Sequence, residues 1–170
     1  MQLANNTANF CVLGRPDPDK NELAISSFDP LNANQKDLLR VPLDPGTNAG
    51  VGLDYAWQIS PDGSWIGIAK RHENRIRLMP LEKDHARTIT INGYSDLIDL
   101  SWAVNSLSLF VSSPGPAGAT LLHVDLDGNA EPIWQQPQTT SFWGFPSPDA
   151  RHLAIASETR ETNVWMISNF

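Results

Sequence analysis

The sequence predicts an all-β fold made of four similar units. The first observation is a turn motif that returns at a nearly constant interval, because Asp19, Asp62, Asn105 and Asp149 are separated by 43, 43 and 44 residues. The second is an apolar, strand-like segment after each of these four anchor residues. The third is the regular occurrence of Pro, Gly, Asn and Asp, which leaves no room for paired helices.

The second copy of the motif explains why the chain turns there. In "WQISPDGSWIGIA", residues 57–69, two apolar segments flank Ser60-Pro61-Asp62-Gly63. Proline presets φ for the first central position of a turn, and glycine adopts the left-handed conformation without steric cost. This segment therefore predicts a tight β-hairpin.

The strand after each anchor has apolar residues four and six positions on. These pairs are Leu23 and Ile25, Ile66 and Ile68, Leu109 and Val111, and Leu153 and Ile155. The residue between them is mostly small, as in Ala24, Gly67 and Ala154, with Phe110 as the exception. This suits a sheet packed between two neighbouring sheets, and a period of about 43 residues is typical of a four-stranded blade. We therefore predict a β-propeller of about four four-stranded antiparallel blades.

The expected blades cover about residues 9–51, 52–95, 96–138 and 139–170 of a single domain, 1–170. The expected strands are 10–14, 22–28 and 38–43; 55–59, 65–70, 75–81 and 87–91; 97–103, 107–113, 120–126 and 131–136; and 141–146, 152–157 and 163–168. The last blade lacks a fourth strand, and the Asn-rich start of the chain is a poor candidate to supply it. We therefore expect a partial ring, about half of a larger propeller, with exposed apolar residues and possible self-association at its end blades.

The composition excludes some classes of partner. The formal net charge is −7 and the pI about 4.9, so the chain has no basic excess for binding nucleic acid. Its apolar runs are too short for a transmembrane helix, and its first residues lack the features of a signal peptide. We expect a soluble protein. The single cysteine, Cys11, is expected to be a small buried strand residue.

Two kinds of segment carry a family resemblance. The stretches "WQISPDGSWIGIA" and "FPSPDARHLAIAS" resemble the repeated motif of TolB-type, WD-repeat-like β-propellers. The ending "HLAIASETRETNVWMISNF" resembles the last blade of bacterial propeller domains that follow a serine/threonine kinase or a winged-helix domain. The resemblance implies the C-terminal sensor or interaction part of a larger bacterial regulator. It also implies an extracytoplasmic location if that regulator is a membrane-anchored kinase.

Three copies depart from the Ser-Pro-Asp-Gly pattern of the motif. The glycine is replaced by Lys20 in the first copy and by Ala150 in the fourth, and the third copy reads Ala103-Val104-Asn105-Ser106. We expect these turns to be less well formed, with Ala150 in the left-handed region.

We find no catalytic or metal-binding motif. The sequence lacks a Gly-x-Ser-x-Gly elbow, and Ser60 and Ser147 are expected to bond the turn backbone. His123, Asp125 and Asp127 alternate along a strand and could hold a metal, but Asp-Leu-Asp-Gly is also an ordinary start of a turn. We expect no metal and no cofactor. His72-Glu73-Asn74 lacks the second histidine of a zinc-binding helix.

Two sets of residues are considered for a central channel. The carboxylates Asp54, Asp96 and Asp99 come near the starts of inner strands and could line such a channel, but their position in the repeat alone also explains them. The six tryptophans are expected mainly between blades, with one or two at the channel mouth; they are residues 57, 65, 102, 134, 143 and 165.

The expected binding surface is formed by loops on one face of the propeller. These loops cover Phe28–Lys36, Arg71–Asn74, Ser113–Ala117 and Glu158–Thr162. The candidate contact residues for a protein or small-molecule ligand are Phe28, Asp29, Leu31, Gln35, Arg71, His72 and Glu73.

We therefore favour a non-enzymatic propeller scaffold that binds a protein or ligand. An alternative is the gating propeller of a prolyl-oligopeptidase-type serine peptidase, with the catalytic domain elsewhere. A third hypothesis is a small enzyme that uses the channel carboxylates, which predicts a metal or sugar in the channel.

Overall fold

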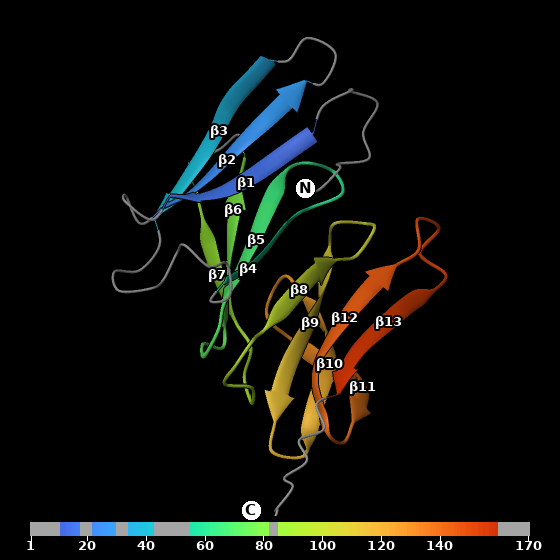
Figure 1. The fold of residues 1–170 in the computed structure, drawn as a ribbon. Coiled ribbons are helices and arrows are strands. Elements are labelled where there is room, and N and C mark those ends of the chain that lie inside the picture. The colour runs from blue at the N-terminus through green and yellow to red at the C-terminus, as the bar shows by residue number, and fades with distance from the viewer. Residues whose placement is uncertain (1–10, 18–21, 30–33, 43–54, 82–84, 160–170) are drawn as a thin grey trace, which may run out of the picture.

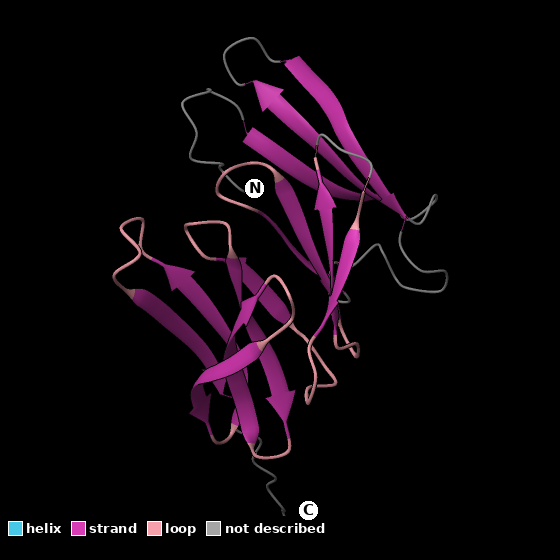
Figure 2. Ribbon diagram, turned by 180° about the vertical axis from the view of Figure 1, so that it is seen from behind, coloured by secondary structure: helices cyan, strands magenta, loops and turns pink. Residues whose placement is uncertain are grey.

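The structure is a computed structural model that describes residues 11–17, 22–29, 34–42, 55–81 and 85–159. Regular structure in these ranges consists of strands alone, without a helix (Figure 2). Accordingly, the described residues contain no helix that could span a membrane. The all-β prediction is confirmed.

Each strand pairs antiparallel with the strand that follows it within its sheet (Figure 1). Sheet 1 contains β1 (Cys11–Asp17), β2 (Glu22–Asp29) and β3 (Asn34–Pro42). Sheet 2 contains β4 (Tyr55–Ile59), β5 (Trp65–Lys70), β6 (Arg75–Pro80) and β7 (Arg87–Thr90). Sheet 3 contains β8 (Asp99–Trp102), β9 (Ser108–Gly115), β10 (Gly118–Asp125) and β11 (Ala130–Gln136). Sheet 4 contains β12 (Thr139–Pro146) and β13 (Leu153–Thr159), and the strand expected at 163–168 lies outside the described residues.

The first strands of sheets 2, 3 and 4 lie next to one another. Strand β8 contacts β4 on one side and β12 on the other. The three sheets therefore follow one another as an arc with β4, β8 and β12 along its inner edge (Figure 1). This is the arrangement that the blade repeat predicts.

The three described copies of the turn motif have the same backbone. Gly63, Ser106 and Ala150 adopt φ of 73°, 60° and 57°, so the left-handed conformation expected for Ala150 is confirmed. Each of these residues donates its N–H to the carbonyl three residues earlier at 2.9 Å. The expectation that the third and fourth turns are less well formed is wrong, since both keep the bonds of the second; the turn at Asp19 lies outside the described residues.

Side chains reinforce these turns in the same way in sheets 2 and 4. Oγ of Ser60 accepts the N–H of Trp65 at 3.0 Å, and Oγ of Ser147 accepts that of His152 at 3.0 Å. Both hydroxyls donate to the anchor carboxylate two residues on. The expected local role of Ser60 and Ser147 is therefore confirmed.

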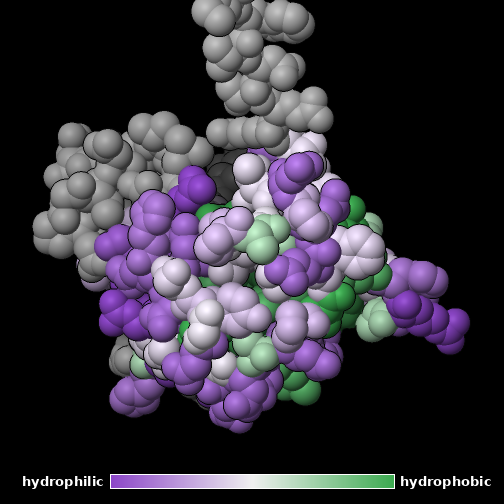
Figure 3. All heavy atoms as spheres, turned by 90° about the horizontal axis from the view of Figure 1, so that it is seen from below, coloured by the Kyte–Doolittle hydropathy of each residue, from purple (hydrophilic) through white to green (hydrophobic). Residues whose placement is uncertain are grey.

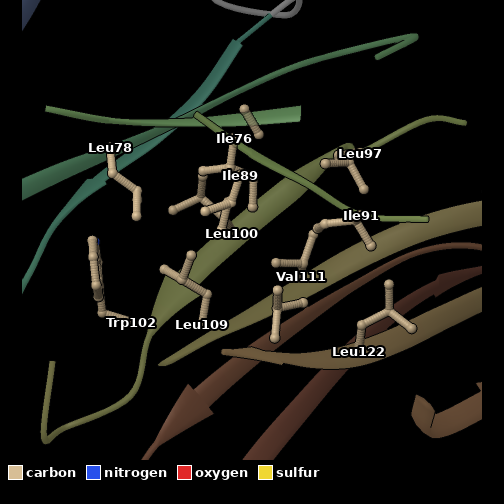
Figure 4. Packing of buried hydrophobic residues seen from close by; sticks show 12 residues of the cluster. Ile76, Leu78, Ile89, Ile91, Leu97, Leu100, Trp102, Leu109, Val111 and Leu122 are labelled. Carbon is tan, nitrogen blue, oxygen red and sulfur yellow. The ribbon is translucent and has the colours of Figure 1, made fainter. Parts of the chain in front are cut away.

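The largest apolar cluster lies between sheets 2 and 3 (Figure 4). Gly67 packs against Trp102 there, because a Cβ on Gly67 would lie 3.4 Å from Nε1 of the indole. The small residue expected between the two apolar positions thus leaves room for the neighbouring blade. The buried members of the cluster are Ala69, Ile76, Leu78, Ile89, Ile91, Leu97, Leu100, Trp102, Leu109, Val111, Leu122 and Val124.

A second cluster joins sheets 1 and 2. Leu23 and Ile25 are 3% and 0% exposed and share this cluster with Ile59, Ile66 and Ile68. We expected Leu23 and Ile25 to be uncovered at the open end of the arc, and this was wrong. Their burial against sheet 2 removes from water the apolar surface that a preceding blade would cover in a longer ring.

Sheet 4 ends the described arc with apolar residues exposed. Its buried Phe142 packs with Ala119 and Leu121 of sheet 3. In contrast, Phe145 is 54% exposed and Ile155 is 38% exposed. At this end the expected exposure of apolar side chains is confirmed for Ile155, whereas Leu153 is partly buried against the same cluster as Phe142.

Two segments that we predicted as loops are largely strands. Phe28 pairs with Gln35 and Asp29 with Asn34, so β2 and β3 extend through most of the polar segment Phe28–Lys36. Likewise, β9 continues through Ser113 to Gly115, which pairs with Gly118 of β10, so only two residues of the segment Ser113–Ala117 lie outside the strands. We had taken the polar side chains as evidence for loops. The hydrogen bonds between paired strands join backbone groups, so polar side chains are compatible with a strand that faces solvent.

Candidate functional site

A concave site lies at the end of the molecule where the first strands of sheets 2, 3 and 4 begin. It is a cavity of about 770 Å³, which we call the funnel. The surface seen from below in Figure 3 is mostly hydrophilic. The funnel is lined by Tyr55, Ala56, Trp57, Arg71, Ile98, Asp99, Pro114, Gly115, Thr139, Thr140, Ser141, Trp143 and Glu158.

The lining follows the sequence repeat. Ala56, Asp99 and Trp143 each lie six residues before the anchor of their unit. Arg71, Pro114 and Glu158 each lie nine residues after it. Equivalent positions in neighbouring blades converge on one axis, so the repeat brings three chemically different residues to each level of the funnel. Sequence reasoning missed Trp143 as a specific lining residue, although these two offsets could have identified it.

Hydrogen bonds between sheets hold the three first strands together. Trp102 of β8 donates its backbone N–H to Oε1 of Gln58 at 2.6 Å and its indole N–H to the carbonyl of Gln58 at 2.9 Å. On the other side, the hydroxyl of Ser101 donates to the carbonyl of Gly144 at 2.5 Å. These bonds fix β8 between β4 and β12, and hence the position of Asp99 at the start of β8.

Arg71 lies in the turn between β5 and β6. The N–H of Glu73 donates to the carbonyl of Lys70 at 3.3 Å, and His72 adopts a φ of 64° inside this turn. The backbone N–H of His72 donates to Oδ1 of Asp96 at 2.7 Å. Asp96, in the segment before β8, thus ties the turn to sheet 3 and sets the position of Arg71.

The acidic groups in contact with the Arg71 turn are engaged with other residues. Glu73 pairs with Lys70 at 3.2 Å and with Arg75 at 3.0 Å, and Asp96 lies 3.4 Å from Nδ1 of His72. The buried Nε of Arg71 has no hydrogen-bond partner among the described residues. The ion pairs found between described side chains likewise do not include Arg71.

A second polar atom in the funnel is also left without a partner. Thr139, at the start of β12, is 4% exposed, and its Oγ1 forms no hydrogen bond with the described part of the protein. A buried hydroxyl without a partner costs free energy. Both unsatisfied side-chain atoms found in the described ranges therefore belong to residues that line the funnel.

Asp99 is the most perturbed acid of the site. Burial raises the pKa of its carboxyl from the ordinary 3.8 to about 7, and a hydrogen bond from the backbone of Leu100 opposes this only in part. Asp99 therefore binds a proton near neutral pH, and it can act as either a donor or an acceptor.

The structure brings only some of the predicted site residues together. Arg71 lines the funnel, whereas the His72 side chain is 83% exposed and Glu73 lines a separate surface hollow beside sheet 2. Of the three carboxylates considered for a channel, Asp99 lines the funnel, Asp96 accepts a hydrogen bond from His72, and Asp54 lies outside the described residues.

The candidate residues of sheet 1 lie on two neighbouring strands. Phe28 and Asp29 lie at the end of β2 and Gln35 near the start of β3. Leu31 lies outside the described residues, and Cys11 is the first residue of β1. Phe28 occupies the same repeat position as Arg71, nine residues after Asp19.

The tryptophans divide between packing and the funnel. Trp102 is buried between sheets 2 and 3, and Trp65 lies under the guanidinium of Arg87 at 5.7 Å. Trp57 and Trp143 line the funnel, as we expected for one or two of the six, while Trp134 is exposed on β11.

The residues considered for a metal have structural contacts. Nε2 of His123 lies 2.8 Å from Oγ of Ser108. Asp125 accepts the N–H groups of Asp127 and Asn129 at 2.9 Å each, which forms the turn between β10 and β11. These bonds to Asn129 and Asp127 lower the pKa of Asp125, as expected for a turn-capping carboxylate.

Comparison with known proteins shows the fold. No family model matches the chain, and no curated protein matches it. Among solved structures, TolB from Acinetobacter baumannii is similar with a TM-score of 0.58 and 17% identity, over 90% of this chain and 39% of that one. The hydrazine synthase of Kuenenia stuttgartiensis is similar with a TM-score of 0.57 and 16% identity, over 92% of this chain and 45% of that one. A structure described as a putative 6-phosphogluconolactonase from Bacteroides uniformis is similar with a TM-score of 0.56 and 13% identity, over 91% of this chain and 46% of that one.

The chain has a β-propeller fold. It spans less than half the length of each of these three proteins. At such identities the likeness concerns the fold, which is known to support unrelated functions.

Proposed function

We propose that the chain is a non-enzymatic part of a β-propeller that binds a small molecule or a protein segment in the funnel. One observation carries the proposal: Nε of Arg71 and Oγ1 of Thr139 are buried in the wall of the funnel without partners among the described residues. Buried polar atoms are normally satisfied, so a bound ligand is the simplest source of the missing hydrogen bonds.

The size and lining of the funnel support a binding site. A cavity of about 770 Å³ lies within the range of small-molecule sites, and Trp57 and Trp143 offer aromatic surface beside several polar groups. Among the described residues, the lining includes no histidine that could activate Thr139 or Ser141 as a nucleophile. These features favour binding over nucleophilic catalysis.

We further propose that the chain acts as the C-terminal sensor or interaction part of a larger bacterial regulator. The sequence resemblance to propellers that follow a kinase or a winged-helix domain is the reason. The peptidase-gating alternative rests on the propeller fold alone, with no feature of the funnel in its favour.

A second candidate function is supported by Asp99. A carboxyl with a pKa of about 7 suits general acid–base catalysis near neutral pH, and Glu158 provides a second carboxyl in the same lining. This would correspond to a small enzyme that uses its channel carboxylates. It predicts turnover of a bound compound that Asp99→Asn abolishes while binding persists.

The proposed function is tested by ligand screening with tryptophan fluorescence, since Trp57 and Trp143 line the funnel. The panel consists of neutral sugars, amino acids, organic carboxylates and tripeptides. We expect saturable binding that Thr140→Trp removes by filling the funnel mouth, while Thr90→Trp on exposed β7 leaves it unchanged. Absence of any binder, or binding that survives Thr140→Trp, would contradict the proposal.

A further inference from the structure

The charges around the funnel indicate what it binds. Arg71 carries a permanent positive charge. Glu73 in its turn and Asp96, which bonds the backbone of that turn, are paired with Lys70, Arg75 and His72. A partly buried guanidinium without a counter-charge is costly, and an oxyanion is its natural partner.

The remaining polar groups of the lining suit hydroxyl groups on the same ligand. Thr139 has a buried Oγ1 that can donate or accept, and Ser141 and Tyr55 add further hydroxyls to the wall. Glu158 can accept hydrogen bonds from ligand hydroxyls. Trp57 and Trp143 can pack against the apolar face of a ring.

We propose that the funnel binds a small hydroxylated organic carboxylate, with its carboxylate on Arg71 and its hydroxyl groups toward Thr139 and Glu158. This inference rests on the proposed binding function of the funnel and specifies its ligand class.

The other ionisable groups of the funnel affect this assignment in different ways. They are Tyr55 of β4, Asp99 of β8 and Glu158 of β13. The Glu158 carboxylate has the same charge sign as the ligand's carboxylate, which is why the ligand's hydroxyl groups are assigned to that side. His72, next to Arg71 in the chain, pairs with Asp96. Burial raises the pKa of Asp99 to about 7, so this carboxyl is protonated in mildly acidic solution. A neutral Asp99 can donate a hydrogen bond to the ligand, whereas an ionised Asp99 repels it.

The test compares ligands that differ only in charge. D-glucuronate and its neutral amide, D-glucuronamide, are titrated calorimetrically into the 170-residue chain at about pH 6, below the raised pKa of Asp99. Acetyl-trialanine and its C-terminal amide form the second pair, because a peptide C-terminus is another source of a carboxylate. We expect glucuronate to bind at least about tenfold more tightly than glucuronamide.

Variants at Arg71 test whether this side chain causes the preference for glucuronate over glucuronamide. Arg71→Gln should bring glucuronate to the affinity of glucuronamide, and Arg71→Lys should restore part of the difference by keeping the charge. Arg75→Gln is the matched control, because Arg75 pairs with Glu73 and does not line the funnel. Thermal unfolding of each variant shows that the fold persists.

The outcomes separate the inference from the proposed function. Equal affinity for glucuronate and glucuronamide, or a preference that survives Arg71→Gln, overturns the ligand class while leaving the funnel as a binding site. A preference for the peptide acid alone overturns the assignment to a free hydroxy acid in favour of a peptide C-terminus. If no probe binds, and the wider panel also yields no ligand, both proposals fail together.

Discussion

At the scale of single residues, two side chains that line the funnel are arranged in ways that reduce the stability of the fold. Thr139 is buried with an unsatisfied hydroxyl, and Asp99 is buried enough to raise the pKa of its carboxyl to about 7. Both reduce the free energy of unfolding of the unliganded protein. Such positions are typical of sites where function opposes stability.

Asp99 gives a prediction about pH. Its carboxyl has a higher pKa in the folded than in the unfolded chain, so the folded state is favoured most below about pH 4, and that advantage is lost as the pH rises through about 7. Asp99→Asn should therefore raise the free energy of unfolding at pH 8 by roughly 1–3 kcal/mol, with a smaller difference at pH 4. Urea unfolding at both pH values measures this. An equal effect at both pH values would show that burial does not raise the pKa of Asp99.

Ala150 gives a prediction about backbone strain. Its φ of 57° is unfavourable for a residue with a Cβ, so Ala150→Gly should stabilise the protein by about 0.5–1 kcal/mol. Ala154→Gly, at an exposed position of β13, is the control and should destabilise by a similar amount. Chemical denaturation compares the two. A loss of stability in both variants would show that the turn at Ala150 has another conformation in solution.

At the scale of elements, the sequence repeat predicted most strands and failed where polarity was taken to mean a loop. The segment Phe28–Lys36 is polar, yet Phe28 pairs with Gln35 in the ladder of β2 and β3. The packing of Leu23 and Ile25 onto sheet 2 was also not predictable, because a strict repeat places equivalent residues on equivalent faces. An end sheet has a neighbouring sheet on one side only, and its own sequence does not specify which of its faces packs against that neighbour.

The candidate site was predictable in part for the same reason. Arg71 was found because it lies in a turn on the expected face, and the repeat offsets also identify Trp143 and Glu158. The missing partner of Thr139 could not be predicted, since burial of its hydroxyl depends on strands from more than one sheet. The same holds for the degree of burial that perturbs Asp99.

Close packing between sheets 2 and 3 depends on one small residue. A Cβ at Gly67 would already lie 3.4 Å from Nε1 of Trp102, so a branched side chain has no space there. Gly67→Val should destabilise the protein by about 2–4 kcal/mol through overpacking and displacement of Trp102 from Gln58. Ala154→Val, exposed on β13, should change stability by less than about 0.5 kcal/mol. A Gly67→Val protein as stable as the parent in urea would contradict the observed approach of the two sheets.

At the scale of the whole molecule, the arc is open at sheet 4. Phe145 and Ile155 are 54% and 38% exposed there, on a sheet whose second strand, β13, has no described neighbour beyond it. The chain also spans less than half of the similar propellers, so further blades in a longer protein are one way to cover this surface.

Exposure at sheet 4 predicts concentration-dependent association of the 170-residue chain. Sedimentation velocity should show a shift toward larger species as the concentration rises, and Phe145→Ser should reduce it. Leu107→Ser is the matched control, because Leu107 is 65% exposed in a turn and should leave association unchanged. A monomer at all concentrations would show that the arc covers its own end.

The central claim is that sheets 2, 3 and 4 jointly form one ligand site. The most direct measurement is a map of backbone amide chemical-shift changes when D-glucuronate is titrated into the protein. The account predicts changes at the start of all three first strands, at Tyr55, Asp99 and Ser141, together with the Arg71 turn, and their loss in Arg71→Gln. Changes confined to a single sheet, or located away from these strand starts, would contradict it.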